Sequence, residues 1–428
     1  MITVSRTTCA IVGGGPAGVV LGLLLARGGV AVTVLEQHDD FNRDFRGDTV
    51  HASTIRLLDE LGLGAAFRAI PQSRLDDFRL PLPDGSEVTL GEFARLEPPY
   101  DHVAMVPQWD LLDMLVRAAT DEPTFSIRMG TSATDVIVEN GRVTGVHLRG
   151  PGGGAEELRA DIVVACDGRD SRIRQAAGLV PIEIPVPFDT WWFRLPLRPG
   201  DAATSLTPRF GGHDVLLSFP RRDYHQVAFF AAKGSDARLR AEGLARFRER
   251  VAALRPEFAD RLDALASMDD VHVLDVRMNR LRRWWRDGLL CIGDAAHAMS
   301  PAGGVGINLA VQDAVAAAAI LRPVLAASTD VAAPTDLAAA LRAASRAVQR
   351  RRTPPMLVVQ AAQRVLHRVV FQAALDGRLA DGPPVIATAL ARHVPWSRGL
   401  YARGIAFGPL PEHAPPFARR DDHTGSAS

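Results

Sequence analysis

The segment TCAIVGGGPAGVVLGLLLARGGVAVTVLE, residues 8–36, decides the fold of this chain. Its pattern predicts a short strand at Thr8–Val12, a glycine-rich turn, an apolar helix at Val19–Ala26 and a second strand at Ala31–Leu35. A strand, a helix and a second strand in this order form a βαβ unit. We therefore expect a Rossmann-like α/β domain at the start of the chain.

Three glycines in this turn, Gly13, Gly15 and Gly18, have the spacing G-x-G-x-x-G. Gly13 allows the tight turn, Gly15 lets a pyrophosphate approach the backbone, and Gly18 lets the helix pack closely on the strand. Glu36 lies 18 residues after Gly18, near the spacing of about 20 that is typical of the acid that binds a ribose hydroxyl. The pattern predicts one bound dinucleotide, because the other glycine cluster, at 152–154, is typical of a hairpin turn.

Composition limits the classes of function. The 428 residues are 47% hydrophobic and carry a formal net charge of zero, so no global field favours nucleic acid or an anionic membrane. The three cysteines, Cys9, Cys166 and Cys291, lie in apolar strands at spacings that indicate neither a disulfide framework nor a metal site. No signal peptide is evident, and the apolar helix expected near 305–327 is interrupted by polar residues, so we expect a cytoplasmic protein.

Alternation and turn signals divide the chain into interleaved domains with a helical end. We expect a dinucleotide-binding domain at 1–74, 98–178 and 277–330, and a substrate domain with an antiparallel sheet at 75–97 and 179–276. A helical section at 331–419, with helices at Asp336–Arg350 and Met356–Leu375, and a disordered tail at 420–428 complete the prediction. The first of these assignments depends on motifs farther along the chain.

Those motifs follow the glycine turn in order. They are Arg46-Gly47, the stretch Cys166-Asp167-Gly168-x-x-Ser171-x-x-Arg174, Gly293-Asp294-Ala295-Ala296-His297, and Pro301 to Asn308. Together with Glu36, this set resembles the FAD-dependent aromatic-ring hydroxylases of the para-hydroxybenzoate hydroxylase type, over about residues 8–325. The resemblance implies bound FAD, transient use of NAD(P)H, and transfer of one oxygen atom from O₂ through a flavin C4a-hydroperoxide.

The resemblance also implies which residues hold FAD. Glu36 would bind the adenosine ribose, Arg46 and Gln108 the phosphate and ribityl region, and Asp294 a ribityl hydroxyl or the pyrophosphate. Asp167 would lie near the pyrophosphate. The complete predicted set is Gly13, Gly15, Pro16, Ala17, Gly18, Glu36, Gln37, Arg46, Gln108, Val136, Asp167, Asp294, Pro301, Gly304, Gly306, Ile307 and Asn308.

The glycines from Gly303 to Gly306 bring backbone N–H groups close to where the resemblance puts the flavin pyrimidine edge. The helix that begins near Ile307-Asn308 would aim its positive dipole end there, and a helix terminus stabilises an adjacent negative charge by roughly 0.3–2 kcal/mol. Reduced flavin is anionic at that edge. The segment is therefore expected to hold the reduced cofactor while it meets oxygen.

Structural alternatives exist for several of these residues. Asp294 could cap a helix near Ala295, and Asp167-Gly168 could be a turn capped by Ser171. His51, His225 and His297 are typical of structural histidines, so the sequence identifies no catalytic residue. The arginines at 350–352 are expected to form a solvated helix face.

The expected substrate is an aromatic or conjugated apolar molecule. Six aromatic residues lie on strands of the expected substrate sheet, of which about half should face the pocket, and no converging arginines for an acidic substrate are evident. They are Trp191, Trp192, Phe193, Phe219, Phe229 and Phe230.

A flavin oxidase or dehydrogenase, or a protein that only binds FAD, remains an alternative. A halogenase would need a lysine near the flavin and a W-x-W-x-I-P motif; the one lysine, Lys233, follows a strand in a Lys-Gly turn, and the motif is absent. Hydroxylation, epoxidation and Baeyer–Villiger insertion are all compatible with the sequence, and so are a monomer and a homodimer.

Overall fold

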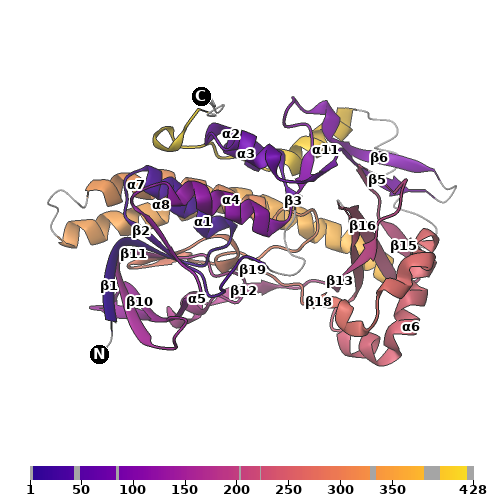
Figure 1. Ribbon diagram of the computed structural model, residues 1–428, viewed down its shortest axis with the longest axis horizontal. Helices are drawn as coiled ribbons and strands as arrows, with labels where there is room; N and C mark the ends of the chain where they lie inside the picture. The colour runs from indigo at the N-terminus through magenta and orange to yellow at the C-terminus, as the bar shows by residue number, and fades with distance from the viewer. Residues whose placement is uncertain are drawn as a thin grey trace.

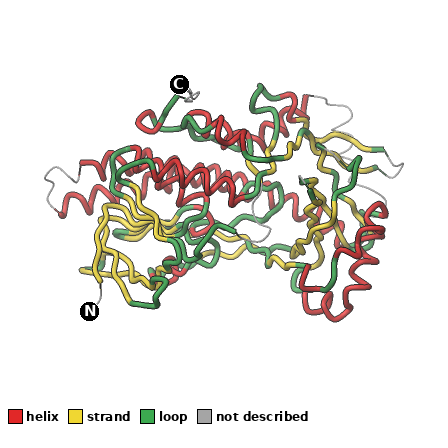
Figure 2. The backbone as a smooth tube through the Cα atoms, viewed as in Figure 1, coloured by secondary structure: helices red, strands yellow, loops and turns green. Residues whose placement is uncertain are grey.

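The computed structural model describes residues 3–42, 49–82, 86–201, 204–221, 223–327, 334–379 and 396–421. Two lobes lie side by side, one around the main sheet and one around β13 and β16 (Figure 1). Helices cluster on one side of the main sheet, and strands dominate the centre of the second lobe (Figure 2). The expectation of an α/β Rossmann-like domain combined with an antiparallel sheet is confirmed.

The main sheet has parallel strands at its centre, in the order β21-β11-β1-β2-β8. Their bounds are β21 Leu289–Cys291, β11 Ala155–Ala165, β1 Thr3–Val12, β2 Val32–Leu35 and β8 Phe125–Arg128. β9 (Ser132–Glu139) and β10 (Arg142–Arg149) form an antiparallel meander with β11, and β20 (Trp285–Arg286) flanks β21. Near-continuous apolar runs such as Cys9–Val12 are fully buried because helices cover the parallel strands.

The helices on this sheet are α1 (Pro16–Arg27), α4 (Gln108–Thr120), α7 (Gly306–Ala327) and α8 (Pro334–Leu366). α1 packs against α4 and α7, and α7 packs against α8 (Figure 1). α7 is the one helix of the described residues that is long and apolar enough to cross a membrane, and 61% of its most apolar window is buried inside the protein. Its polar residues Gln312 and Asp313 are also buried, so α7 is a core helix.

The second lobe is an antiparallel sheet in the order β15-β16-β17-β13-β18. Its strands are β13 Phe188–Pro196, β15 Arg209–Gly211, β16 Asp214–Pro220, β17 Tyr224–Ala232 and β18 His272–Leu274. The helix α6 (Asp236–Leu254) covers one face (Figure 1). The other face packs against Ala302 and the end of the helical section.

Alternation along the strands sorts the six aromatic residues into two groups. Trp191, Phe193 and Phe229 face the α6 side, where they form a core with Phe247. Trp192, Phe219 and Phe230 face the side of Ala302. Half of the set therefore lies on the face that is turned toward the first lobe, as the period of two predicts.

Smaller elements connect the two lobes. β5 (Asp77–Pro81) pairs with β6 (Glu87–Glu92) on one side and with β14 (Ser205–Leu206) on the other, which supports the proposed grouping of 75–97 with 179–276. The remaining elements are α2 Ala52–Glu60, α3 Gly64–Ala69, α5 Arg172–Ala176, α9 Gln372–Leu375, α11 Trp396–Phe407, β3 Thr49–Val50, β4 Ser73–Leu75, β7 Val103–Met105, β12 Pro181–Ile184 and β19 Met278–Leu281. The domain boundaries themselves stay a proposal.

The helical section differs from the prediction at its two prolines. α8 continues through Pro354 and Pro355 where the sequence predicts a break, and a π-helical turn at His367–Phe371 joins it to α9. Pro354 and Pro355 remove two backbone donors from the helix. Just before them, the hydroxyl of Thr353 donates to the carbonyl of Gln349 at 2.7 Å. Tertiary contacts on both sides of the prolines hold the helix, so local propensity is overridden.

The prediction of a solvated arginine face at 350–352 is wrong for Arg352, whose side chain is 1% exposed. Its Nε donates to Asp313 Oδ1 at 3.0 Å, while Asp313 Oδ2 lies 2.6 Å from His297 Nε2 and accepts from the N–H of Gly293 at 3.1 Å. Glu412 lies 3.4 Å from Arg352 Nη1 and completes the buried ion network. Carboxylates offset the cost of burying the Arg352 guanidinium, and these partners are remote in sequence.

Residues 410–418, the C-terminal strap, lie across the first lobe. Glu412 contacts Arg351 and Arg352, Ala414 donates its N–H to Glu60 at 2.6 Å, and the carbonyl of Ala418 accepts from Arg27 at 2.9 Å. The strap therefore joins α8, α2 and α1. Of the predicted disordered tail at 420–428, residues 422–428 lie outside the described residues, while the N–H of Arg420 donates to the carbonyl of Glu60.

Replacing Arg352 tests the buried network. Arg352→Met removes one partner and leaves Asp313 and Glu412 buried with an uncompensated charge, so we expect a loss of about 3–5 kcal/mol in the free energy of unfolding. Arg350→Met is the matched control, because Arg350 is exposed on the same run and should change stability by less than about 0.5 kcal/mol. Urea denaturation followed by circular dichroism measures both; equal losses would contradict the network.

The same network predicts a pH dependence. Burial by itself would raise the pKa of Asp313, but the charges and hydrogen bonds of His297 and Arg352 outweigh it and hold this pKa below 3.8. A depressed pKa in the folded state adds stability above the ordinary value, and this stability is lost as the pH falls through the folded-state pKa. The stability gap between wild type and Asp313→Asn should therefore be constant from about pH 8 to about pH 6 and shrink below about pH 4. Asp263→Asn, at a side chain that is 96% exposed, serves as the control, and a gap that persists at acid pH argues against this assignment.

Candidate functional site

Four of the predicted cofactor residues follow four adjacent parallel strands. Gly13 comes directly after β1, Glu36 directly after β2, Asp167 two residues after β11, and Asp294 three residues after β21. The register aligns the strand ends, because Val12 pairs with Leu35 and Ala165, and Ala165 pairs with Cys291. Ligands of open α/β sheets bind at the carboxyl ends of the strands, so this edge is the candidate site.

The glycine turn has the geometry that its spacing predicts. Gly13 has φ 106°, a conformation that favours glycine, and a Cβ there would overlap the backbone at Cys166. A Cβ at Gly18 would overlap the carbonyl oxygen of Gly13, so only glycine lets α1 approach the strand. Gly15 is different, since no atom lies within 4 Å of the position that its Cβ would take. Pro16 and Ala17 begin α1 beyond it, and the open space at Gly15 lies at the N-terminus of that helix.

Glu36 is buried, with 2% of its surface exposed. Its Oε2 accepts from the N–H of Gly14 at 2.9 Å, and its Oε1 accepts from the N–H of His38 at 3.0 Å and lies 2.7 Å from His38 Nδ1. These contacts hold the carboxylate beside the glycine turn. The ribose contact stays a prediction, supported by this position.

Asp167 follows β11 and supports a turn as well as facing the edge. Burial raises the pKa of Asp167, although hydrogen bonds from Ser171 and the N–H of Ile173 act in the opposite direction. Its Oδ1 is buried and has no hydrogen-bond partner in the described part of the chain. Ser171 caps α5 by accepting from the N–H of Arg174 at 2.9 Å, as the structural alternative states. The guanidinium of Arg174 donates to the carbonyls of Ala295 at 3.1 Å and Arg169 at 2.8 Å, which ties this turn to the one that follows β21.

Asp294 lies in a short 3₁₀ turn, Gly293–Ala295, and is half-buried. The N-cap position of this turn is Ile292, which has no side chain able to cap, so the helix-cap alternative for Asp294 stays untested. Burial raises the pKa of Asp294, while Arg169 and His297 act to lower it. The neighbouring His297 is 1% exposed and bonded to Asp313, which agrees with a structural histidine.

A glycine loop precedes α7. Gly303 and Gly304 have φ of 86° and 62°, and the hydroxyl of Thr49 donates to the carbonyl of Gly304 at 2.9 Å. The N–H of Leu309 bonds to the carbonyl of Val305 at 3.0 Å, so the N–H groups of residues 306–308 come before the first helical hydrogen bond. Such groups attract an anion, as expected for Gly306, Ile307 and Asn308.

Asn308 joins this helix start to α2. Its Oδ1 accepts from the hydroxyl of Thr54 at 2.6 Å and from the N–H of His51 at 3.2 Å. These bonds orient the amide so that Nδ2 is the remaining donor, and Nδ2 is buried without a partner in the described residues. His51 itself is buried and bonded to the carbonyl of Ile405 at 2.8 Å, which agrees with a structural role.

Side chains of the helical section hold the loop at its other end. Gln363 Nε2 donates to the carbonyls of Ser300 at 2.8 Å and Ala302 at 2.9 Å, and Gln363 Oε1 accepts from the N–H of Ser300. His367 Nε2 lies 2.9 Å from Ser300 Oγ, and burial lowers the pKa of His367 to about 4. The backbone next to Pro301 is therefore fixed by α8.

Other predicted cofactor residues are not brought together by any contact described. Arg46 lies outside the described residues, so its predicted phosphate contact stays untested. Gln37 is exposed, Gln108 is half-buried at the start of α4, and Val136 is buried in β9 opposite Val146. These assignments remain predictions.

The face of the second sheet that is turned toward Ala302 is aromatic and carries unpartnered donors. Trp192 and Phe219 stack with 6.3 Å between ring centroids. Trp192 Nε1 and Thr190 Oγ1 are buried and have no hydrogen-bond partner in the described residues. Such groups cost free energy unless a ligand or water satisfies them, so they mark a candidate substrate surface.

Lys233 is paired with two carboxylates, Asp189 at 2.6 Å and Asp275 at 2.5 Å. Its ammonium group is therefore not the lysine that a halogenase needs near the flavin.

Several supporting residues were missed from the sequence: Thr49, Thr54, Ser300, Asp313, Arg352, Gln363 and His367. Asp313 carries a detectable signal, since it is the one acid in an apolar helix. The others are polar residues in ordinary helical or loop sequence, and only the tertiary structure brings them to the loop.

The family model described as FAD binding domain matches residues 6–384. A 6-methylpretetramide 4-monooxygenase from Streptomyces rimosus is 39% identical over 323 residues, which cover 74% of this chain and 75% of the relative. A para-nitrophenol 4-monooxygenase from Pseudomonas sp. is 27% identical over 71% of this chain and 75% of the relative.

Among solved structures, a probable FAD-dependent monooxygenase from Pseudomonas aeruginosa superposes with a TM-score of 0.70. It is 22% identical and covers 87% of this chain and 99% of that chain, so it confirms the fold. The predicted family and its FAD cofactor are thereby confirmed. This chain belongs to the FAD binding domain family and is a flavoprotein monooxygenase.

Proposed function

We propose that this monooxygenase uses NAD(P)H and O₂ to hydroxylate a phenolic aromatic small molecule that is bound against Trp192 and Phe219. The observation that carries the proposal is the convergence of the glycine turn, Glu36, Asp167 and Asp294 at one sheet edge. The cytoplasm is the proposed location, because Cys9, Cys166 and Cys291 form no disulfides.

The residues at this edge fit an extended FAD. The open space at Gly15 admits a pyrophosphate close to the N-terminus of α1. Glu36 lies beside that turn for the adenosine ribose, and Asp294 lies beyond it for the ribityl chain or the pyrophosphate. The buried Nδ2 of Asn308 is a donor that has no partner in the described protein, as expected for a group that binds a cofactor carbonyl.

When bound, FAD supplies the electron transfer from NAD(P)H and the activation of O₂ that no amino-acid side chain provides. The chain supplies the electrostatics. The N–H groups of the first turn of α7, at residues 306–308, and the helix dipole of α7 stabilise negative charge at this end of the cofactor site. Gln363 and His367 keep the loop in place, so that these donors need little reorganisation.

The proposed substrate class rests on the second lobe. Trp192 and Phe219 offer a planar apolar wall, and Trp192 Nε1 and Thr190 Oγ1 offer donors to an oxygen of a phenol. The names of the relatives, for 6-methylpretetramide and para-nitrophenol, favour aromatic substrates. Oxygenation at an electron-rich ring carbon is the reaction that this class favours.

Labelled oxygen tests the function directly. The FAD-loaded protein should consume NAD(P)H faster when a suitable phenol is added, and the product should contain one ¹⁸O atom from ¹⁸O₂. Peroxide or a dehydrogenated product without ¹⁸O would point to the oxidase or dehydrogenase alternative.

Trp192→Phe keeps the aromatic wall and removes the Nε1 donor, so kcat/KM for the phenol should fall by about tenfold. NAD(P)H oxidation without substrate should stay unchanged, and Trp191→Phe on the opposite face is the control.

Substitutions at Gly15 and Gly18 distinguish the contribution of the turn to cofactor binding from its contribution to packing. Gly15→Ala places its methyl group in open space, so the apoprotein should unfold at the wild-type urea concentration while FAD affinity falls by about tenfold or more. Gly18→Ala should destabilise the apoprotein itself, because its Cβ overlaps Gly13. Quenching of flavin fluorescence and urea denaturation measure the two effects. Unchanged FAD affinity in Gly15→Ala would remove the glycine turn from the proposed site; exposed Gly152→Ala is the control.

A further inference from the structure

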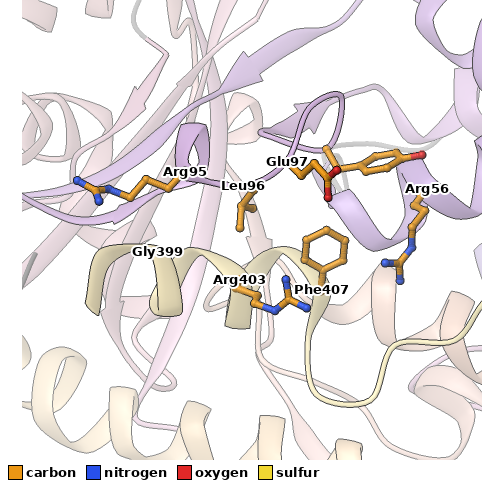
Figure 3. Close-up of a pocket in the computed structure, with 8 residues that line it drawn as sticks. Arg56, Arg95, Leu96, Glu97, Gly399, Arg403 and Phe407 are labelled. Atoms are coloured by element: carbon orange, nitrogen blue, oxygen red, sulfur yellow. The ribbon is translucent and has the colours of Figure 1, made fainter. Parts of the chain in front are cut away.

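A pocket lies beside α2, and its lining is separate from the residues of the proposed cofactor edge. It has a volume of about 510 Å³ and opens between α2, the segment 95–100 and α11 (Figure 3). Its walls include Arg56, Arg95, Glu97, Arg403 and Phe407. None of these residues belongs to the predicted FAD set, and the arginines come from three separate parts of the chain. This is the convergence of arginines that the sequence does not reveal.

Among the described residues, two of the three arginines of the pocket form no ion pair. Arg95 is paired with Glu92 at 2.6 Å, and its side chain extends away from the other two (Figure 3). Arg56 Nε and Nη2 are buried without a hydrogen-bond partner, and neither Arg56 nor Arg403 forms an ion pair within the part of the chain that the structure describes. Burial lowers the pKa of Arg56, with Glu60 acting in the opposite direction.

The carboxylates near Arg56 bind other residues. Glu60, one helical turn along α2, binds the N–H of Ala414 at 2.6 Å and His413. Asp59 pairs with Arg68 at 2.7 Å. Glu97 is the one acidic residue of the pocket lining, so Arg56 and Arg403 together exceed the negative charge beside them.

The two free guanidinium groups are held in place by an aromatic ring. Arg56 Cζ lies 4.9 Å and Arg403 Cζ 5.5 Å from the centroid of Phe407, and both groups lie beside this ring in Figure 3. Cation–π contacts of this kind orient a guanidinium without neutralising its charge. Two oriented, uncompensated forks of donors match the oxygens of a phosphate or carboxylate.

We propose that this pocket binds the phosphate or carboxylate group of a small molecule through Arg56 and Arg403. The position favours a molecule that takes part in the reaction. The N–H of His51, five residues before Arg56, bonds to Asn308 at the start of α7, and five helical residues span only about 8 Å. The anion therefore belongs either to the phosphates of NAD(P)H or to an acidic aromatic ligand. The NAD(P)H arm rests on the proposed function, whereas binding of the anion itself does not.

Calorimetric titration of the FAD-loaded protein tests the pocket with three probes: sodium pyrophosphate, NADPH and benzoate. The variants are Arg56→Gln and Arg403→Gln, and the control is Arg350→Gln on the exposed face of α8. Loss of one charge-assisted hydrogen bond should weaken the bound probe about tenfold in each variant, with no change in the control. Weaker pyrophosphate and NADPH binding, with a higher KM for NADPH at unchanged kcat, assigns the phosphate source. Weaker benzoate binding alone assigns the carboxylate source.

The proposal is overturned if wild type binds none of the three probes, or if both variants bind them as tightly as wild type. Circular dichroism and FAD absorbance confirm that the variants are folded and loaded. A wild-type protein that binds pyrophosphate but incorporates no ¹⁸O contradicts the proposed function and leaves the anion pocket standing. If ¹⁸O is incorporated but neither substitution changes binding of any probe, the anion pocket is overturned and the proposed function stands.

Discussion

The close approach of α1 to the sheet is the constraint on which the site depends. It requires a bare backbone at Gly13 and Gly18, because a side-chain carbon at either position would overlap neighbouring backbone. Only this approach brings the N-terminus of α1 to the edge where β1, β2, β11 and β21 end. The parallel register then aligns Glu36, Asp167 and Asp294 along that edge without any direct contact between them.

The helical section stabilises this edge from behind. Arg352 and Gln363 lie on the same helix, and they hold the turn after β21 through Asp313 and the glycine loop through Ser300. Because one helix, α8, contacts both the turn after β21 and the glycine loop, it fixes the distance between them. The buried charges are costly to remove from water, and the specific geometry that they impose on backbone N–H groups is a physical reason for their presence.

Much of this arrangement could be predicted from the sequence. The βαβ opening, the antiparallel second sheet, the FAD cofactor and the family are confirmed, because glycine spacing and strand alternation are local signals. Alternation also predicts that aromatic residues divide between two faces, although only the pairing of β13 with β17 shows that Trp192 and not Trp191 faces the first lobe. The individual cofactor contacts stay predictions.

What could not be predicted depends on distant partners. Arg350 and Arg352 are neighbours with the same chemistry, and only the position of Asp313 separates an exposed arginine from a buried one. The continuous helix through Pro354 and Pro355 is likewise decided by tertiary contacts. Arg56 and Arg403 come together because α11 packs beside α2, for which no local pattern exists.

The C-terminal strap affects how the protein is made. Arg27, Glu60 and Arg352 receive partners from residues 412–418, so the first lobe lacks these contacts until the strap has been synthesised. Until then α1 and α2 are incompletely covered. Folding of this lobe therefore cannot be completed before the strap has left the ribosome, and apolar helices exposed in the nascent chain are a natural target for chaperones.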